Sequence, residues 1–273
     1  MKTVYFGIIF LTILNCRVCA QDTIYLEKYI GDLKKVTVTI GSNAYNFLFD
    51  TGGGETCISP ALAKSLGKTI YGSATGFRMS GEIIKYQQAD SISFDLGGAA
   101  IFHSTIGVLD IMKFLPKDFP KLDGVLSLKS FRDKILTIDL PNNKMILETP
   151  RSCYKLVRNK KALPARFANG PDGNELTIFL GIPQQEHLYW FLFDSGNLGE
   201  LLLSHHTAYE WGLESDTVHQ WARLGSLKIN IGIKQFTSEA ASLEIIYDGS
   251  LNFAIISKSR FIIDFSKKRV WLN

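Results

Sequence analysis

The sequence predicts a mainly β protein built from two similar halves. Three observations predict this fold class: one six-residue segment occurs twice, several segments alternate apolar and polar residues, and the helical segments are few and short. The repeated segment reads Phe-Leu-Phe-Asp-Thr-Gly at residues 47–52 and Phe-Leu-Phe-Asp-Ser-Gly at residues 191–196. Unrelated hairpins of similar composition are the alternative explanation, but further matches in the same order favour a duplication.

Two pairs of landmarks follow the repeated segment in each half. Asp123-Gly124 corresponds to Asp248-Gly249, and Ile138-Asp139-Leu140 corresponds to Ile263-Asp264-Phe265, with the same spacing between the landmarks in both halves. Because their spacing marks them as features of the fold, we interpret the four acids as residues that cap turns or end strands.

Each half contains the same kinds of elements. Strands with one buried face are expected where apolar and polar residues alternate, at Val36–Ile40, Ser91–Leu96 and Ser226–Ile231. The continuously apolar segments Phe47–Phe49 and Leu188–Phe193 predict strands buried on both faces. A short helix is expected after Ser59 and another after Ser204, because each serine is a suitable N-cap and a glycine follows the helical segment.

The first 20 residues have the layout of a secretory signal peptide. Lys2 gives a positive start, Val4–Leu14 is almost wholly apolar, and Val18-Cys19-Ala20 forms a small-residue cleavage site. The apolar run is too short for a membrane span, although a short membrane anchor is the alternative. We expect export to the periplasm or the extracellular space, and no association with a membrane after the signal is removed.

The remaining chain divides at a segment rich in charged and turn-forming residues. We assign residues 21–148 to an N-terminal lobe, 149–174 to an interlobe connection and 175–273 to a C-terminal lobe. The connection contains Asn169-Gly170-Pro171-Asp172-Gly173, which is typical of a turn.

Composition excludes several classes of partner. The 273 residues carry a formal net charge of +4, without a basic stripe, so nucleic acid is not an expected partner. The five histidines and the cysteines lack the spacing of metal ligands, so we expect no metal and no other cofactor. After signal removal only Cys57 and Cys153 remain, either as buried small apolar residues or as one disulfide.

Asp50 and Asp194, which end the two repeated apolar segments, are the candidate catalytic residues. A carboxylate carried toward a buried position is costly unless it is paired or hydrogen-bonded. Two such carboxyl groups, brought together by pairing of the halves, would share one proton, because like charges a few ångströms apart do not both ionise cheaply. Such a pair can activate water for amide hydrolysis without a covalent intermediate.

These segments resemble the catalytic motif of the pepsin and retropepsin superfamily of aspartic proteases, which is two hydrophobic residues followed by Asp-Thr/Ser-Gly. The resemblance spans about residues 34–148 and 163–272, and is nearest to the compact bacterial, retropepsin-like form with two lobes in one chain. It implies a two-lobed, pseudo-two-fold fold with short helices and an aspartic endopeptidase that cleaves a peptide or an unfolded protein. A monomer is expected, because one chain supplies both halves of the site. By resemblance the catalytic dyad is Asp50 and Asp194, supported by Thr51, Gly52, Ser195 and Gly196.

The family also carries a β-hairpin flap that closes over the substrate. The candidate flap is Tyr71–Tyr86, in which Tyr71, Phe77 and Met79 would contact substrate. The sequence does not distinguish Tyr71 from Phe77 as the aromatic residue of the flap, and an ordinary surface hairpin is the alternative.

Four positions depart from the family pattern. Ser127 and Asn252 stand where the family has glycine, and the motifs are followed by Gly53 and Asn197, where the family usually has Ser, Thr or Ala. These departures motivate an alternative function: a catalytically inactive pepsin-like protein that binds a peptide or a glycan in the interlobe cleft.

Overall fold

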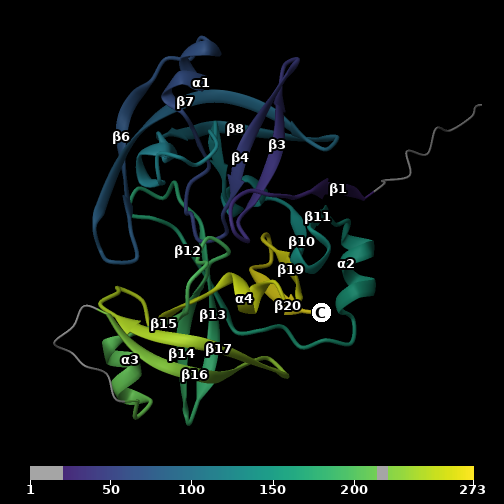
Figure 1. Ribbon diagram of the computed structural model, residues 1–273. Coiled ribbons are helices and arrows are strands. Elements are labelled where there is room, and N and C mark those ends of the chain that lie inside the picture. The colour runs from purple at the N-terminus through teal and green to yellow at the C-terminus, as the bar shows by residue number, and fades with distance from the viewer. Residues whose placement is uncertain (1–20, 214–220) are drawn as a thin grey trace, which may run out of the picture.

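The described part of the protein forms three β-sheets, and short helices lie at their ends and edges (Figure 1). The computed structural model describes residues 21–213 and 221–273, so the predicted signal peptide lies outside the described residues. None of the helices in these two ranges is long and apolar enough to cross a membrane. The mainly β fold class predicted from the sequence is confirmed.

The first sheet belongs to the N-terminal half and has the strand order β2-β3-β4-β9-β5-β8-β7-β6. Its strands are β2 (Glu27–Lys28), β3 (Lys34–Ile40), β4 (Asn43–Phe49), β5 (Cys57–Ile58), β6 (Tyr71–Phe77), β7 (Ile83–Leu96), β8 (Ala99–Val108) and β9 (Gly124–Leu126). Helix α1 (Pro60–Ser65) begins as expected at Ser59, whose side chain accepts a hydrogen bond from the Leu62 amide. Short 3-10 helices follow at η1 (Ile111–Phe114), η2 (Leu128–Phe131) and η3 (Leu140–Asn142).

The second sheet repeats this plan in the C-terminal half, with the order β12-β13-β14-β18-β15-β17-β16. Its strands are β12 (Ala165–Ala168), β13 (Thr177–Gln184), β14 (His187–Phe193), β15 (Leu201–Ser204), β16 (Trp221–Ile231), β17 (Lys234–Leu243) and β18 (Gly249–Leu251). Helix α3 (His205–Glu210) begins at Ser204 as expected, and α4 (Phe253–Ile256) follows β18. Strand β14 pairs in parallel with β18, as β4 does with β9.

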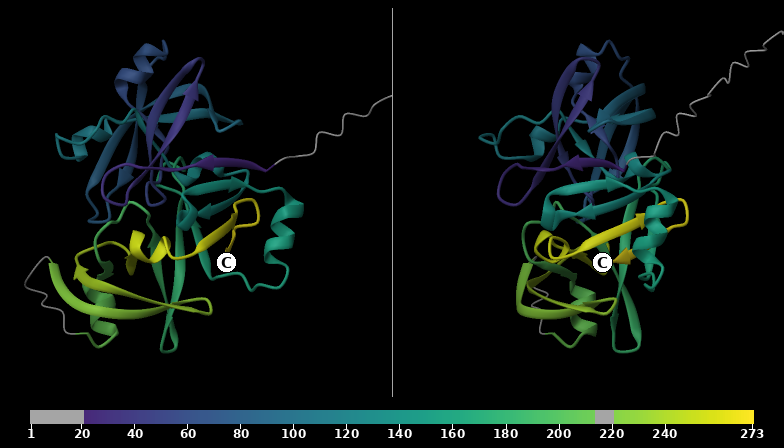
Figure 2. Two further views of the ribbon diagram at one scale, coloured as in Figure 1. Left: turned by 45° about the vertical axis from the view of Figure 1, so that its right-hand side comes forward. Right: turned by 90° about the vertical axis from the view of Figure 1, so that its right-hand side faces the viewer.

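The third sheet takes strands from both halves, in the order β1-β11-β10-β19-β20. Its strands are β1 (Asp22–Tyr25), β10 (Ile135–Asp139), β11 (Lys144–Leu147), β19 (Arg260–Asp264) and β20 (Arg269–Leu272). The central pair, β10 with β19, is antiparallel and places Ile138 opposite Phe261, both fully buried. Figure 2 shows from two further sides that this sheet lies between the other two. The two halves are therefore joined by main-chain hydrogen bonds as well as by one covalent link.

The segment assigned as the interlobe connection contains more regular structure than the sequence indicated. Helix α2 (Pro150–Val157) begins with a capping box formed by Thr149 and Ser152, and β12 pairs with β13. Cys153 of α2 packs against Ile262 and Trp271 of the third sheet. Both Cys153 and Cys57 are free and buried, so the disulfide that the sequence left open is not formed.

The four landmark acids occupy structural positions, as interpreted from the sequence. An Asp123 carboxylate oxygen accepts a hydrogen bond from the Asn46 amide at 3.1 Å, and Asp248 accepts one from the Trp190 amide at 2.7 Å. These contacts fix β4 and β14, the strands that carry the repeated motifs. In the third sheet, Asp139 pairs with Arg260 at 3.0 Å and Asp264 accepts from the Lys267 amide at 3.0 Å.

Candidate active site

The two repeated motifs begin in the last three residues of β4 and of β14, where both strands are buried. The phenylalanines of both motifs are almost completely buried, as the sequence predicted: Phe47, Phe49, Phe191 and Phe193. The strands that pair in parallel with β4 and β14 are β9 and β18, and each begins with a glycine. The phenylalanine rings lie against the backbone of these glycines. A Cβ added at Gly124 would lie 2.4 Å from Cε1 of Phe47, and one at Gly249 would lie 2.3 Å from Cε1 of Phe191.

The hydroxyl residues of the motifs tie the two halves together. Thr51 Oγ1 donates to the Phe193 carbonyl at 2.7 Å and accepts from the Ser195 amide at 2.8 Å. Ser195 Oγ accepts from the Thr51 amide at 3.0 Å. Both side chains are buried, so these bonds form away from water, where an unpaired polar group is costly. The bonds hold the loops of Asp50 and Asp194 against each other.

The carboxyl groups of Asp50 and Asp194 meet at this junction. Each accepts a hydrogen bond from the amide of its own motif glycine, at 2.9 Å from Gly52 and at 2.8 Å from Gly196. A Cβ added at Gly196 would lie 2.9 Å from Oδ1 of Asp50 and 3.1 Å from Oδ1 of Asp194, so both acids surround this glycine. A Cβ added at Gly52 would lie 2.4 Å from Cγ of Asp194. Only glycine at these positions allows the two carboxyl groups to approach.

The pair is electrostatically coupled. Burial raises the pKa of the Asp50 carboxyl, opposed by the Gly52 and Gly53 amides. Burial also raises the pKa of Asp194, and the neighbouring Asp50 charge raises it further, while the Gly196 and Asn197 amides lower it. The pair therefore retains a proton at pH values at which a free aspartate is ionised. A proton donor and a proton acceptor are thus available side by side.

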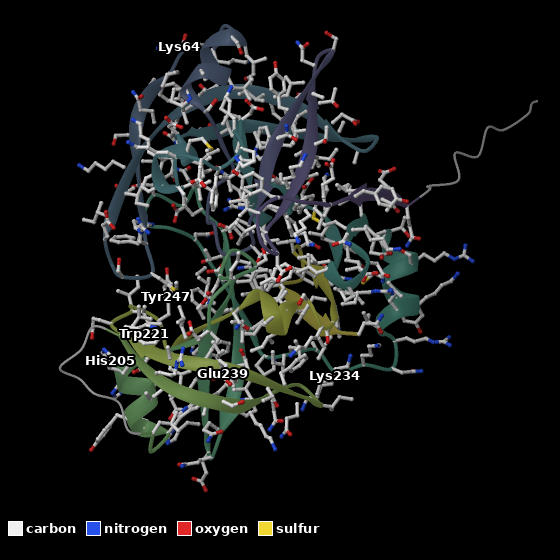
Figure 3. The ribbon with its side chains drawn as sticks, in the orientation of Figure 1. Lys64, His205, Trp221, Lys234, Glu239 and Tyr247 are labelled. Carbon is white, nitrogen blue, oxygen red and sulfur yellow. The ribbon has the colours of Figure 1, made fainter. Side chains whose placement is uncertain are left out.

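A cavity of about 550 Å³ lies beside Asp50, between the two halves. The β6–β7 hairpin contributes Phe77, Ile84 and Tyr86, and the C-terminal half contributes Ile246 and Tyr247. In Figure 3, Tyr247 lies on the side of the second lobe that faces the first, below the free end of the β6–β7 hairpin. The cavity is large enough for a side chain of a bound peptide, with mostly apolar walls.

The predicted flap forms an antiparallel hairpin of β6 and β7, which extends toward the second lobe (Figure 1). The carbonyl of Met79 accepts a hydrogen bond from the Ile246 amide at 3.0 Å. Further up the hairpin, the Thr75 amide donates to a carboxylate oxygen of Asp172 at 2.7 Å. Two hydrogen bonds from outside the first sheet therefore hold the hairpin over the cavity.

The three residues proposed as flap contacts have different positions. Phe77 lines the cavity, whereas Met79 bonds to the second lobe through its main chain. Tyr71 lies outside the cavity lining, at the far end of the hairpin, where its hydroxyl bonds to Asp90. The tyrosine at the cavity is instead Tyr86, which the sequence named only as the end of the flap range.

The cavity also contains charged residues that the sequence did not indicate. Glu55 and Glu175 line it, and the Tyr86 hydroxyl lies 3.5 Å from Oε1 of Glu175. Lys129 binds both carboxylate oxygens of buried Glu55, at 2.6 and 2.7 Å. Burial raises the pKa of Glu55 to about 7, against the opposing charge of Lys129. No local pattern marks these residues, because they meet only when the connection folds back into the cleft.

The four departures from the family pattern have structural functions. Ser127 caps η2 and hydrogen-bonds with Thr56 at 3.0 Å. Asn252 caps α4, and its amide donates to the Gly199 carbonyl at 2.8 Å. Asn197 accepts from the Gly199 amide at 3.0 Å and so braces its own loop. At Gly53 an added Cβ would lie 3.3 Å from Oδ2 of Asp50. None of these residues separates the two carboxyl groups.

Two β lobes, a sheet shared between them and one aspartate from each lobe at their junction define a pepsin-like fold. Within the described residues, no group of three or more His, Cys, Asp or Glu side chains is arranged to hold a metal ion. Residues 36–129, which include the Asp50 motif, match the family model described as aspartyl protease.

Solved structures support the same fold. The chain is similar to conglutin gamma, a basic 7S globulin from lupine seeds, with 8% identity, 93% of this chain and 94% of that chain covered, and a TM-score of 0.57. The basic 7S globulin from soybean matches with 8% identity over 93% and 94% of the two chains, and a TM-score of 0.56. At this identity the likeness concerns the fold alone. No curated protein sequence matches the chain significantly.

Proposed function

We propose that the protein is an aspartic endopeptidase in which Asp50 and Asp194 activate a water molecule. The observation that carries this proposal is the meeting of the two carboxyl groups at the lobe junction, where Thr51 and Ser195 bond across the two loops. The aspartyl protease match over residues 36–129 supports the same chemistry. We place the protein with the compact retropepsin-like enzymes that carry both lobes in one chain.

The reaction uses one protonated and one ionised carboxyl group. The ionised group takes a proton from water, and the protonated group donates a hydrogen bond to the carbonyl oxygen of the substrate. The water oxygen bonds to the carbonyl carbon, giving a tetrahedral intermediate. The leaving nitrogen then takes a proton from the dyad as the C–N bond breaks, which yields an acid and an amine without a covalent bond to the protein.

A peptide or an unfolded protein fits the cleft, since the cavity beside Asp50 is covered by a hairpin rather than by a rigid wall. The hairpin must release its bonds to Ile246 and Asp172 to admit a chain, and re-forming them would exclude water from the site.

We further propose that the chain acts as a monomer and is exported. The first proposal rests on the presence of both aspartates in one polypeptide, and the second rests on the signal-like pattern of residues 1–20.

Hydrolysis of a reduced, unfolded protein by the purified chain tests the proposal. Asp50→Asn and Asp194→Asn should each lower the rate by about 10³-fold or more, because each removes a proton-transfer group. Asp118→Asn, at an exposed residue outside the cavity, is the matched control and should leave the rate unchanged. Activity that survives either dyad substitution would rule this mechanism out.

A pepstatin-type inhibitor separates the enzyme from the alternative of an inactive binding protein. Inhibition of hydrolysis supports the proposed function. A folded protein that binds peptides in the cleft, yet cleaves none between acidic and neutral pH, would instead be the inactive pepsin-like protein considered from the sequence.

A further inference from the structure

Glu175 adds a further carboxyl group to the cavity that Asp50 and Glu55 line, and it has no part in the hydrolysis described above. Glu175 follows the turn of the interlobe connection and lines the cavity. The amide of the next residue, Leu176, donates a hydrogen bond to the Gly54 carbonyl at 2.8 Å. This bond draws the connection against the loop that carries Asp50. Glu175 is therefore held in the same cavity that Asp50 lines.

Three backbone segments make room for this carboxylate. A Cβ added at Gly76 would lie 2.5 Å from Oε1 of Glu175, and one added at Gly170 would lie 2.6 Å from Oε2. At Gly54 an added Cβ would lie 2.9 Å from Cβ of Glu175 and 3.0 Å from Oε2. The three glycines belong to the flap hairpin, the connection and the loop after Asp50. The position of the Glu175 side chain is thus set from three sides.

The nearby positive charges are committed to other partners. Lys129 binds both oxygens of Glu55, and its side chain is 12% exposed. Arg132 donates to the main-chain carbonyl of Glu175 at 2.8 Å and to Asn169, not to the carboxylate. Across residues 21–213 and 221–273, no Lys, Arg or His nitrogen lies within ion-pair distance of the Glu175 carboxylate. The cavity therefore contains a carboxyl group that no ion pair of the protein neutralises. Burial raises the pKa of Glu175, whereas the Tyr86 hydroxyl and the charge of Lys129 lower it. A cation in the cavity would favour the ionised form of this carboxyl group.

The walls leading to Glu175 are apolar. Phe77 and Ile84 come from the hairpin, and Leu109 and Ile111 come from the segment after β8. An apolar passage with a carboxylate at one side matches the side chains of Lys and Arg, in which a methylene stem carries a terminal cation. We propose that this cavity binds a Lys or Arg side chain of the substrate, with Glu175 as the residue that selects it.

The recognised residue lies next to the bond that is cleaved. A Cβ added at Gly53 would lie 3.3 Å from Oδ2 of Asp50, and one added at the next residue, Gly54, would lie 3.0 Å from Oε2 of Glu175. The two carboxyl groups therefore lie close to adjacent residues of one loop. The specificity is local, because the chain as a whole is basic, with 30 Lys and Arg against 26 Asp and Glu, and would not attract basic peptides by its net charge.

This inference rests on the proposed function for its substrate class, but binding tests it without hydrolysis. The probes are peptides with a reduced, uncleavable bond and Lys, norleucine or Glu directly before or after that bond. Norleucine keeps the four-carbon stem of lysine and lacks its charge. Of the two lysine peptides, one with Lys before the bond and one with Lys after it, we take the one that binds more tightly. Its affinity should exceed that of its norleucine counterpart by about 10-fold or more, since hydrogen bonds to charged groups are worth about 1.5–3 kcal/mol.

The substitution Glu175→Gln keeps the shape of the side chain and should remove the lysine preference, while norleucine affinity changes less than about 2-fold by the same reasoning. Glu186→Gln, at an exposed residue in the β13–β14 turn, makes the same change in net charge and should retain the preference. Glu175→Lys should reverse the preference in favour of the Glu peptide.

Equal binding of lysine and norleucine peptides by the unmodified protein would overturn the inference, whatever the variants do. A lysine preference that survives Glu175→Gln would overturn it as well. A protein that cleaves no peptide but keeps a Glu175-dependent lysine preference would contradict the proposed hydrolysis and support this subsite. Cleavage without any charge preference would support the proposed hydrolysis and contradict this subsite.

Discussion

Thr51 shows how a single hydroxyl group joins the two lobes. Its oxygen donates to the Phe193 carbonyl and accepts from the Ser195 amide, and the side chain is fully buried. The equivalent hydroxyl of Ser195 accepts from the Thr51 amide. Because these polar groups are enclosed, the hydroxyl cannot be replaced by water without a rearrangement of the loops.

Thr51→Val should therefore lower the free energy of unfolding by about 1–3 kcal/mol for each main-chain group that is left buried without a partner. Urea denaturation measures the loss. Thr51→Ser is the control, because it keeps the hydroxyl and removes only a methyl group. Equal stability of the valine and serine variants would show that the hydroxyl does not hold the lobes together.

The dyad makes stability depend on pH. Burial, and for Asp194 the charge of its partner, raise the pKa values of the two carboxyl groups in the folded protein. An unfolded aspartate ionises near pH 3.9, so above that pH the folded state holds more protons than the unfolded state. Stability should therefore fall as the pH rises from about 4, by at most about 1.4 kcal/mol per pH unit for one proton.

Asp194→Asn removes this proton and the repulsion between the two carboxyl groups. The variant should be more stable than the unmodified protein at pH 7, with a difference that shrinks toward pH 4. Urea unfolding at several pH values measures both curves, and Asp118→Asn serves as a surface control. Parallel curves for Asp194→Asn and the unmodified protein would contradict the raised pKa of the pair.

At the scale of elements, the flap hairpin is held by contacts from outside its own sheet. Asp172 of the connection accepts from the Thr75 amide, and the Ile246 amide donates to Met79. The sequence indicated a hairpin at Tyr71–Tyr86. Its anchoring could not be predicted, because the partners lie far along the chain, in the connection and in the C-terminal half.

Asp172→Ala should loosen the hairpin without unfolding the protein. The Thr75 amide loses a hydrogen bond to a charged acceptor, and its exchange with deuterium should accelerate by about 10-fold. Hydrogen exchange with mass spectrometry over β6 and β7 measures the change, with Asp118→Ala as the control. Unchanged exchange in β6 would mean that Asp172 does not restrain the flap.

At the scale of the whole molecule, the third sheet makes the two lobes one folding unit. Strands β10 and β19 pair across the lobes. The ring of Phe261 in β19 also packs edge to face against Phe193 of the second sheet, with centroids 4.8 Å apart. Separation of the lobes would expose both strand edges and the apolar surface between them. We therefore expect the lobes to unfold together.

The tryptophans provide a test, because all four lie in the C-terminal half, at positions 190, 211, 221 and 271. Urea transitions followed by tryptophan fluorescence and by far-UV circular dichroism should coincide. Phe261→Ala leaves a cavity at a fully buried position and should lower the free energy of unfolding by about 3–5 kcal/mol. Both transitions should move to lower urea concentration by the same amount. A fluorescence transition that separates from the dichroism signal would show that the lobes unfold independently.

Four features could be predicted from the sequence alone: the duplication, the buried strands that carry Asp50 and Asp194, the capped helices after Ser59 and Ser204, and the hairpin. Each of these leaves a local pattern of period, cap or glycine. Helix α2 also has a local signal, the capping box at Thr149, although the charged composition of the segment obscured it.

Which residues contact one another across the fold became known only from the three-dimensional structure. In the structure Tyr86, and not Tyr71, lines the cavity, and Glu175 lies in the cavity that Asp50 also lines. Cys57 and Cys153 are unpaired, and β10 and β19 join the lobes. The physical reason is that these contacts connect residues far apart in the chain. Such contacts depend on how sheets and loops pack in space, and they leave no periodicity or spacing in a single sequence.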